Sequence, residues 1–125
     1  MNTSPFPGTV LIVEDEALVR FEIAGALRDD GWTVLEAGTG EDAIALIKNG
    51  HIDVLFTDIQ LASRLSGWDV AEAFRQCRPD GTVLYASGNT IDWSRQVGNS
   101  RFFGKPYETA EILQACRTPR VACPK

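Results

Sequence analysis

The residues of this sequence that are best suited to chemistry are acids, a hydroxyl and an amine that each follow a short apolar run. The pair Glu14-Asp15 follows the first run, Asp58 the third, Ser87 the fourth and Lys105 the fifth. Carboxylates that gather in one place repel each other unless protons or a cation compensate them. A hard divalent cation such as Mg²⁺ prefers oxygen ligands, and a lysine with a hydroxyl can bind a phosphoryl group. If the fold brings these residues together, their chemistry predicts a site for metal-assisted phosphoryl transfer.

The elements that must position these residues alternate along the chain. Short runs of strand type lie at 9–13, 33–37, 53–57, 82–86 and 101–104. Between them, apolar residues recur at helical spacing, namely Val19, Ile23 and Leu27, then Ala43, Ile44 and Ile47 within 41–48, then Val70, Ala71, Phe74 and Cys77, and finally Thr109, Ile112, Leu113 and Cys116. This alternation predicts an α/β fold with a five-stranded parallel sheet and helices on both faces. The near-continuous apolar strands agree with burial on both faces.

The order of the strands determines whether one site can form. In the doubly wound, flavodoxin-like order 2-1-3-4-5, the first and third strands are neighbours, and ligands bind beyond the carboxyl ends of the strands where the order reverses. This order brings Asp15 and Asp58 together, with Glu14 beside them. Ser87 and Lys105 then follow the next two strands, at the same edge of the sheet.

Each of these residues alone has an ordinary structural explanation. An aspartate after a strand is often a helix cap, and an acidic run there can be the first turn of a helix, which the helix dipole favours. Ser87-Gly88-Asn89 has the composition of a turn, and a lysine before a proline can simply be solvated. The coincidence of four strand ends that carry acid, acid, hydroxyl and amine favours a single functional site.

Four motifs at these strand ends resemble the receiver domains of two-component response regulators. They are Val-Glu-Asp-Glu at 13–16, Phe-Thr-Asp-Ile at 56–59, Tyr-Ala-Ser-Gly at 85–88 and Gly-Lys-Pro-Tyr at 104–107. They occur in the family's order and at the expected strand ends. The resemblance implies a receiver domain over 9–118, between an N-terminal leader at 1–8 and a C-terminal tail at 119–125.

The resemblance implies a role for each acidic or hydroxyl residue of the site. Asp58 is expected to accept a phosphoryl group. Asp15, Asp58 and the backbone carbonyl of Gln60 are expected to bind Mg²⁺, with Glu14 as the companion acid that usually acts through water. Ser87 is expected to move and bind a phosphoryl oxygen.

The same resemblance implies roles for residues further along the chain. Lys105 is expected to be the cationic partner of the phosphoryl group, and the Lys105-Pro106 peptide bond is expected to be cis. Phe102 falls at the position of the switch aromatic. Gln60 and Asn89 each lie two positions after a site residue, where the family tunes dephosphorylation.

The implied function is a phosphorelay switch. A sensor histidine kinase or a histidine phosphotransfer domain would donate the phosphoryl group, and acetyl phosphate would react slowly. Phosphorylation would bias a two-state equilibrium and change a protein-interaction surface. Without an output domain, the protein is expected to be an adaptor for a downstream protein or a phosphate sink, and it could form a weak dimer. It is not expected to be an enzyme beyond catalysing its own phosphorylation and dephosphorylation.

Two segments depart from the family's pattern. The loop after Asp58, Ile-Gln-Leu-Ala-Ser-Arg-Leu-Ser-Gly at 59–67, lacks the Met-Pro often found there and is slightly long. The segment from Ser87 to Lys105 is short, so we expect an abbreviated fourth helix. Because that helix usually belongs to the output surface, the output surface is expected to differ.

Composition argues against several other classes of protein. The chain has 125 residues and a net charge of −5, with no run of basic residues, which argues against direct binding of nucleic acid. No signal peptide and no apolar stretch of membrane-spanning length is evident. Three cysteines without a close-spaced pair are expected to be reduced thiols, which fits the cytoplasm.

Three alternative functions fit the sequence less well. An aspartate-dependent phosphatase normally carries a second carboxylate two residues after its nucleophile, where this chain has Gln60. A flavodoxin-like cofactor binder needs a phosphate loop after the first strand, where Glu14-Asp15-Glu16 would repel a phosphate. The nearest alternative is a degenerate receiver that binds proteins without phosphorylation, and the complete set of site residues argues against it.

Overall fold

The computed structural model describes residues 8–88 and 93–117, in which strands and helices alternate as the sequence predicts. The strands are β1 (Thr9–Val13), β2 (Thr33–Ala37), β3 (Val54–Asp58), β4 (Thr82–Ser87) and β5 (Ser100–Gly104). The helices are α1 (Ala17–Asp29), α2 (Gly40–Asn49), α3 (Gly67–Cys77), the short 3-10 helix η1 (Trp93–Arg95) and α4 (Thr109–Arg117). The predicted strand boundaries are correct to within one residue. The expected tail at 119–125 and, apart from Gly8, the expected leader at 1–8 lie outside the described residues.

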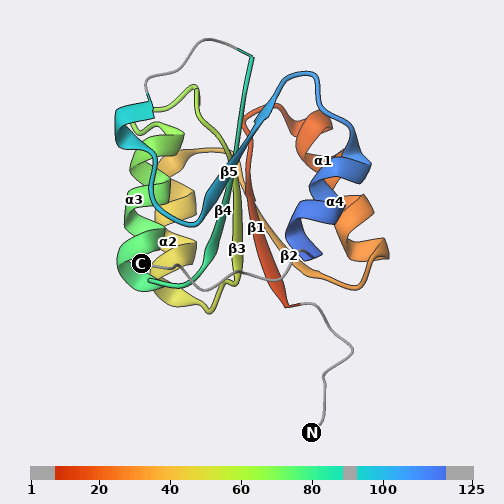
Figure 1. Ribbon diagram of the computed structural model, residues 1–125, viewed down its shortest axis with the longest axis horizontal. Coiled ribbons are helices and arrows are strands. Elements are labelled where there is room, and N and C mark those ends of the chain that lie inside the picture. The colour runs from red at the N-terminus through yellow and green to blue at the C-terminus, as the bar shows by residue number, and fades with distance from the viewer. Residues whose placement is uncertain (1–7, 89–92, 118–125) are drawn as a thin grey trace, which may run out of the picture.

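The five strands form one parallel sheet in the predicted order β2-β1-β3-β4-β5. Figure 1 shows α1 and α4 on one face of this sheet and α2 and α3 on the other. The fold is therefore the doubly wound, flavodoxin-like α/β fold, with the order reversing between β1 and β3. None of the described helices is long and apolar enough to cross a membrane.

Apolar residues of the strands alternate between two cores, one on each face of the sheet. In β1, Val10 and Ile12 face the core under α1 and α4, whereas Leu11 and Val13 face the core under α2 and α3. The central strand β3 is buried along its whole length. Burial on both faces explains why the sequences of these central strands are apolar up to their carboxyl ends, where β3 finishes in the buried polar residues Thr57 and Asp58.

The spacing of Cys77 and Cys116 predicts that both lie on the apolar faces of their helices, and this prediction is wrong for Cys77. Cys116 is buried under α4 as predicted, but Cys77 is exposed. Cys77 is the last residue of α3, so no further turn of the helix follows to cover it. Trp32 and Trp68 are buried, while the side chain of Trp93 lies outside the described part of the chain.

The segment between β4 and β5 is attached to α3 by polar contacts. Within its described part, η1 is the helical element, in agreement with the predicted shortening of the fourth helix. Arg95 pairs with Asp69 and Glu72 of α3, each at 2.8 Å. The backbone N–H of Val97 donates a hydrogen bond of 3.2 Å to the hydroxyl of Tyr85 in β4. Ion pairs and this hydrogen bond therefore fix the segment, in addition to the packing of the Val97 side chain against the core under α2 and α3.

The N-terminus of α3 packs directly on the backbone at the end of β3. Ser66 caps α3 by accepting from the N–H of Asp69 at 3.4 Å, and the Asp69 carboxylate accepts from the N–H of Ser66 at 2.8 Å. Gly67 permits the close approach, because a Cβ there would lie 2.2 Å from the carbonyl oxygen of Asp58 and 2.7 Å from the Cα of Ile59. The start of α3 therefore helps to fix the position of Asp58.

We predict that Gly67→Ala lowers the free energy of unfolding by about 3 kcal/mol, because backbone atoms obstruct the added methyl group. The matched control is Gly25→Ala in α1, where an added Cβ would meet no atom within 4 Å. This control should raise the free energy of unfolding by up to about 1 kcal/mol, since alanine favours helix. Urea unfolding followed by circular dichroism measures both. Equal stability of Gly67→Ala and the wild type would contradict the close packing of α3 on β3.

Candidate functional site

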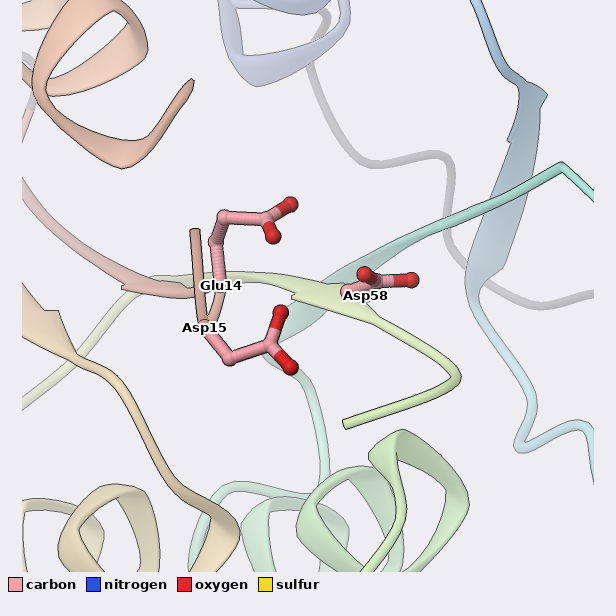
Figure 2. A group of neighbouring side chains, drawn as sticks. All are labelled: Glu14, Asp15 and Asp58. Carbon is pink, nitrogen blue, oxygen red and sulfur yellow. The ribbon is translucent and has the colours of Figure 1, made fainter. Parts of the chain in front are cut away.

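Three carboxylates converge at the carboxyl ends of β1 and β3. Val13 pairs with Thr57 in the sheet, so the residues that follow them, Glu14 and Asp58, lie side by side. Asp15 comes next in the chain, and one carboxylate oxygen from each acid lies within 4.8 Å of the others. Figure 2 shows Glu14 and Asp15 just beyond the end of β1 and Asp58 at the end of the neighbouring strand β3. The structure thus brings together the acids that the sequence analysis grouped.

The three acids differ in exposure and in their hydrogen bonds. Glu14 and Asp58 are only 4% and 8% exposed, whereas Asp15 is exposed. The Glu14 carboxylate accepts a hydrogen bond of 3.0 Å from the backbone N–H of Glu16. The Asp15 carboxylate accepts one of 2.8 Å from the backbone N–H of Ala62, in the loop after β3. Two acids are therefore held inside the protein, and the third lies at its surface.

Lys105 supplies the positive charge that the buried acids require. Its Nζ lies 3.0 Å from Asp58 Oδ2 and 3.4 Å from Glu14 Oε1. The backbone N–H of Lys105 donates to the carbonyl of Ser87 at 2.9 Å, which places the lysine directly beyond the β4–β5 pair. The Lys105-Pro106 peptide bond is cis, as expected. The lysine therefore lies between two acids from two other strands.

Ser87 and Gln60 both lie next to Asp58, Ser87 buried in the protein and Gln60 exposed at the surface. Asp58 pairs with Ala86 in the sheet, so Ser87 lies one residue further along β4, and it is 2% exposed. The backbone N–H of Gln60 donates to Asp58 Oδ1 at 3.3 Å. Asn89, the other residue expected to tune dephosphorylation, lies outside the described residues.

Phe102 lies in β5 directly beside Tyr85 of β4. It is partly buried against the core under α2 and α3, whereas Phe103 packs against the core under α1 and α4. The alternation of the two rings follows from the period of two in a strand. The role of Phe102 as a switch stays a prediction.

Burial and charge together shift the pKa values of the site. Burial is the main cause that raises the pKa of Glu14, and the charge of Asp58 raises it further. Burial alone would lower the pKa of Lys105, but its hydrogen bond with Asp58 and the charges of both acids raise this pKa above its ordinary value. Burial and the charge of Glu14 raise the pKa of Tyr107 to about 12. The site thus holds Lys105 protonated and opposes the ionisation of Glu14.

Arg20 also belongs to the site, and the sequence analysis missed it. Its Nη1 donates to the backbone carbonyl of Glu14 at 2.7 Å, and its Nε pairs with Glu36 of β2 at 3.1 Å. The side chain is only 17% exposed. The signal available in the sequence was that Arg20 directly follows Val19, which belongs to the apolar stripe of this helix, so its side chain starts close to the buried face. Its partners could not be inferred, because only the fold brings Glu14 and Glu36 within its reach.

The residues at this site fit a divalent cation of the hard type. The donor atoms are carboxylate oxygens of Glu14, Asp15 and Asp58, close enough together to share one ion. Hard oxygen donors with access from one exposed side match the preference of Mg²⁺, which keeps several water ligands. Lys105 offsets one of the three negative charges, which leaves a net negative cluster.

Comparison with known proteins identifies the class to which this fold and site belong. The family described as the response regulator receiver domain matches residues 10–117. The chain therefore belongs to the response regulator receiver domain family, as its motifs predict. It is a receiver domain of two-component signalling. Receiver domains as a family bind Mg²⁺ at an acidic pocket.

Individual relatives agree with this assignment. The transcriptional regulatory protein PdtaR of Mycobacterium tuberculosis is 29% identical over 113 residues, which are 87% of this chain and 55% of PdtaR. The chain thus spans about half the length of that relative. A response regulator receiver protein from Sinorhizobium medicae is 32% identical, with a TM-score of 0.82 over 86% of this chain and 90% of its own. The receiver domain of the hybrid histidine kinase CckA is 29% identical, with a TM-score of 0.74 over 89% and 100%.

We predict that Glu14→Gln raises the free energy of unfolding at pH 7 in metal-free buffer. An acid whose pKa is higher in the folded than in the unfolded chain costs stability once it is ionised. The cost arises as the pH rises above the ordinary pKa of 4.5, so the gain from Glu14→Gln should vanish below that pH. Urea unfolding across pH 4 to 8 measures it, with Glu22→Gln on the exposed face of α1 as control. A loss of stability at pH 7 would show that the contacts of Glu14 outweigh its burial.

Proposed function

We propose that this chain is a phosphorelay switch that accepts a phosphoryl group on Asp58 with the help of Mg²⁺. The observation that carries the proposal is the position of Lys105, within 3.4 Å of both Glu14 and Asp58. An ordinary ion pair needs one acid for one base. Here one lysine faces two acids, and a third acid stands beside them. Because close carboxylates repel each other, such a surplus destabilises the folded protein unless a bound cation compensates the charge.

The proposed reaction is an attack by an Asp58 carboxylate oxygen on the phosphorus of a phosphohistidine. An O–P bond forms as the P–N bond breaks, and the electron pair of that bond remains on the histidine nitrogen. The product is an acyl phosphate on Asp58. Lys105 and the Ser87 hydroxyl would receive the phosphoryl oxygens and stabilise their charge by charge-assisted hydrogen bonds.

The chain's own residues would hold the metal ion and orient the nucleophile. Glu14, Asp15, Asp58 and the backbone carbonyl of Gln60 are the proposed Mg²⁺ ligands. When bound, Mg²⁺ supplies charge that neutralises the acids and the phosphoryl oxygens. The Gln60 N–H holds Asp58 Oδ1 and Lys105 holds Oδ2, so the carboxylate is fixed from both sides before a donor arrives.

The proposed donor is a sensor histidine kinase or a histidine phosphotransfer domain. Receiver domains pair with such proteins, and one structure similar to this chain is the receiver of a hybrid histidine kinase. On α1, which begins shortly after the acidic pair, Leu18 and Phe21 are 84% and 57% exposed. Large apolar side chains left exposed beside a phosphoacceptor suit contact with a protein donor.

The proposed consequence of phosphorylation is a changed surface for a downstream protein. The phosphoryl group would draw Ser87 inward, and Phe102 would occupy the space beside it, which biases a two-state equilibrium. The chain would act as an adaptor or a phosphate sink, and it would catalyse only its own phosphorylation and dephosphorylation. Gln60 and Asn89 would set the lifetime of the acyl phosphate.

We predict that the wild type gains one phosphoryl group from acetyl phosphate in the presence of Mg²⁺. Intact mass spectrometry measures the adduct. Asp58→Asn should gain none, because its amide is a poor nucleophile, and EDTA should abolish the adduct on the wild type.

The alternative function, a receiver that binds proteins without phosphorylation, makes the opposite prediction. In that case neither acetyl phosphate nor a phosphohistidine donor would modify the wild type, and calorimetry would detect no Mg²⁺ binding. An adduct that persists on Asp58→Asn would instead place the acceptor at another residue.

We predict that Lys105→Gln slows phosphorylation by acetyl phosphate on the order of 100-fold at saturating Mg²⁺, because the variant lacks the donor aimed at the developing charge. The matched control is Lys48→Gln, an exposed lysine on α2. The rate is measured by the appearance of the phosphorylated mass over time. A rate within threefold of the wild type, taken as about 0.65 kcal/mol of barrier, would remove Lys105 from the reaction.

A further inference from the structure

The loop between β3 and α3 (residues 59–66) contacts both the acidic site and the start of α2, through neighbouring residues. It is the segment in which the sequence departs from the family's pattern after Asp58. Within it, the backbone N–H of Ala62 donates 2.8 Å to Asp15 Oδ2, across 47 residues of sequence. The next residue, Ser63, accepts from the backbone N–H of Gly40 at 3.2 Å. One loop thus joins a proposed metal ligand to the start of a helix.

The attachment of the loop to α2 has a polar part and a steric part. The Ser63 hydroxyl accepts from Gly40 and donates to the carbonyl of Leu65 at 2.9 Å, so it also closes the loop on itself. Leu65 lies on Gly40, where an added Cβ would come within 2.8 Å of the Leu65 Cβ and 3.0 Å of its carbonyl oxygen. Gly40 thus donates a hydrogen bond to the loop, and its lack of a side chain leaves room for Leu65 to pack against it.

Asp15 needs this support more than the other two acids. Glu14 and Asp58 are buried and have Lys105 as a common partner, whereas Asp15 is exposed. An exposed aspartate loses rotamer freedom when it binds a metal ion, and that entropy opposes binding. A backbone N–H that already holds one carboxylate oxygen reduces the loss and leaves the other oxygen available as a ligand.

We propose that Ser63 and Gly40 are positioning residues that hold the β3–α3 loop so that the Ala62 N–H orients Asp15 for Mg²⁺. This inference rests on the proposed metal site. It adds that the metal ligand Asp15 is held in place through contacts between the β3–α3 loop and Gly40 at the start of α2. Linkage makes the effect reciprocal: if the loop favours metal binding, Mg²⁺ must stabilise the loop by the same factor. The β3–α3 loop and the start of α2 then form a surface that responds to occupation of the site.

Two variants loosen the loop by different means and leave the ligands intact. Ser63→Ala removes the hydrogen bonds of the tether. Gly40→Ala adds a methyl group where Leu65 rests, yet alanine at this first position of α2 favours the helix itself. The controls are Ser100→Ala, whose hydroxyl bonds to Gln96 and Val97 away from the acids, and Gly25→Ala.

Isothermal titration calorimetry with MgCl₂ and hydrogen exchange of the Ala62 amide test the proposal. We expect Ser63→Ala and Gly40→Ala to weaken Mg²⁺ binding on the order of 10-fold, the effect of a lost supporting contact, with no change in the controls. In metal-free buffer, the Ala62 amide should exchange faster in both variants than in the wild type. In the wild type, Mg²⁺ should slow that exchange.

Each other outcome overturns a defined part of the proposal. Unchanged Mg²⁺ affinity in both variants would remove the positioning role while leaving the proposed function intact. Faster exchange of Ala62 without a loss of affinity would reduce the tether to a structural contact. A wild type that binds no Mg²⁺ would overturn the proposed metal site and this inference together.

Discussion

Glu14 and Asp58 lie at adjacent strand ends where little water screens their charges, and their mutual repulsion is the constraint on which the rest of the site depends. Lys105 offsets this repulsion from β5, and Arg20 holds the backbone of Glu14 from α1. Burial makes the ionisation of Glu14 unfavourable, which is visible in its raised pKa. The arrangement is thus prepared for additional positive charge, and the proposed Mg²⁺ would supply it.

The fold places this repulsion where the protein can best resist it. β1 and β3 are the central strands of the sheet, and each is packed between two apolar cores. The start of α3 packs on the backbone of Asp58 through Gly67, so Asp58, the proposed phosphoacceptor, has little freedom to move away from Glu14.

The two segments that depart from the family's pattern are attached by polar contacts to helices on the same face of the sheet. The β3–α3 loop is tied to α2 through Ser63, and the segment before β5 is tied to α3 through Arg95. The ion pairs of Arg95 are partly exposed to solvent, and such pairs contribute about 0–1 kcal/mol each. The Arg95 contacts can therefore rearrange at low cost, which would suit this face to the proposed response to phosphorylation.

The sequence alone determined the five strands, their order once the motifs were recognised, and the acids, hydroxyl and lysine of the site. These follow from apolar periodicity and from the rule that parallel strands end at one edge, both of which are local or topological. Only the tertiary structure revealed Arg20 on Glu14, the Ala62 N–H on Asp15 and the exposure of Cys77. These depend on where a helix ends or a loop folds back, and such long-range contacts leave no periodic trace in the chain.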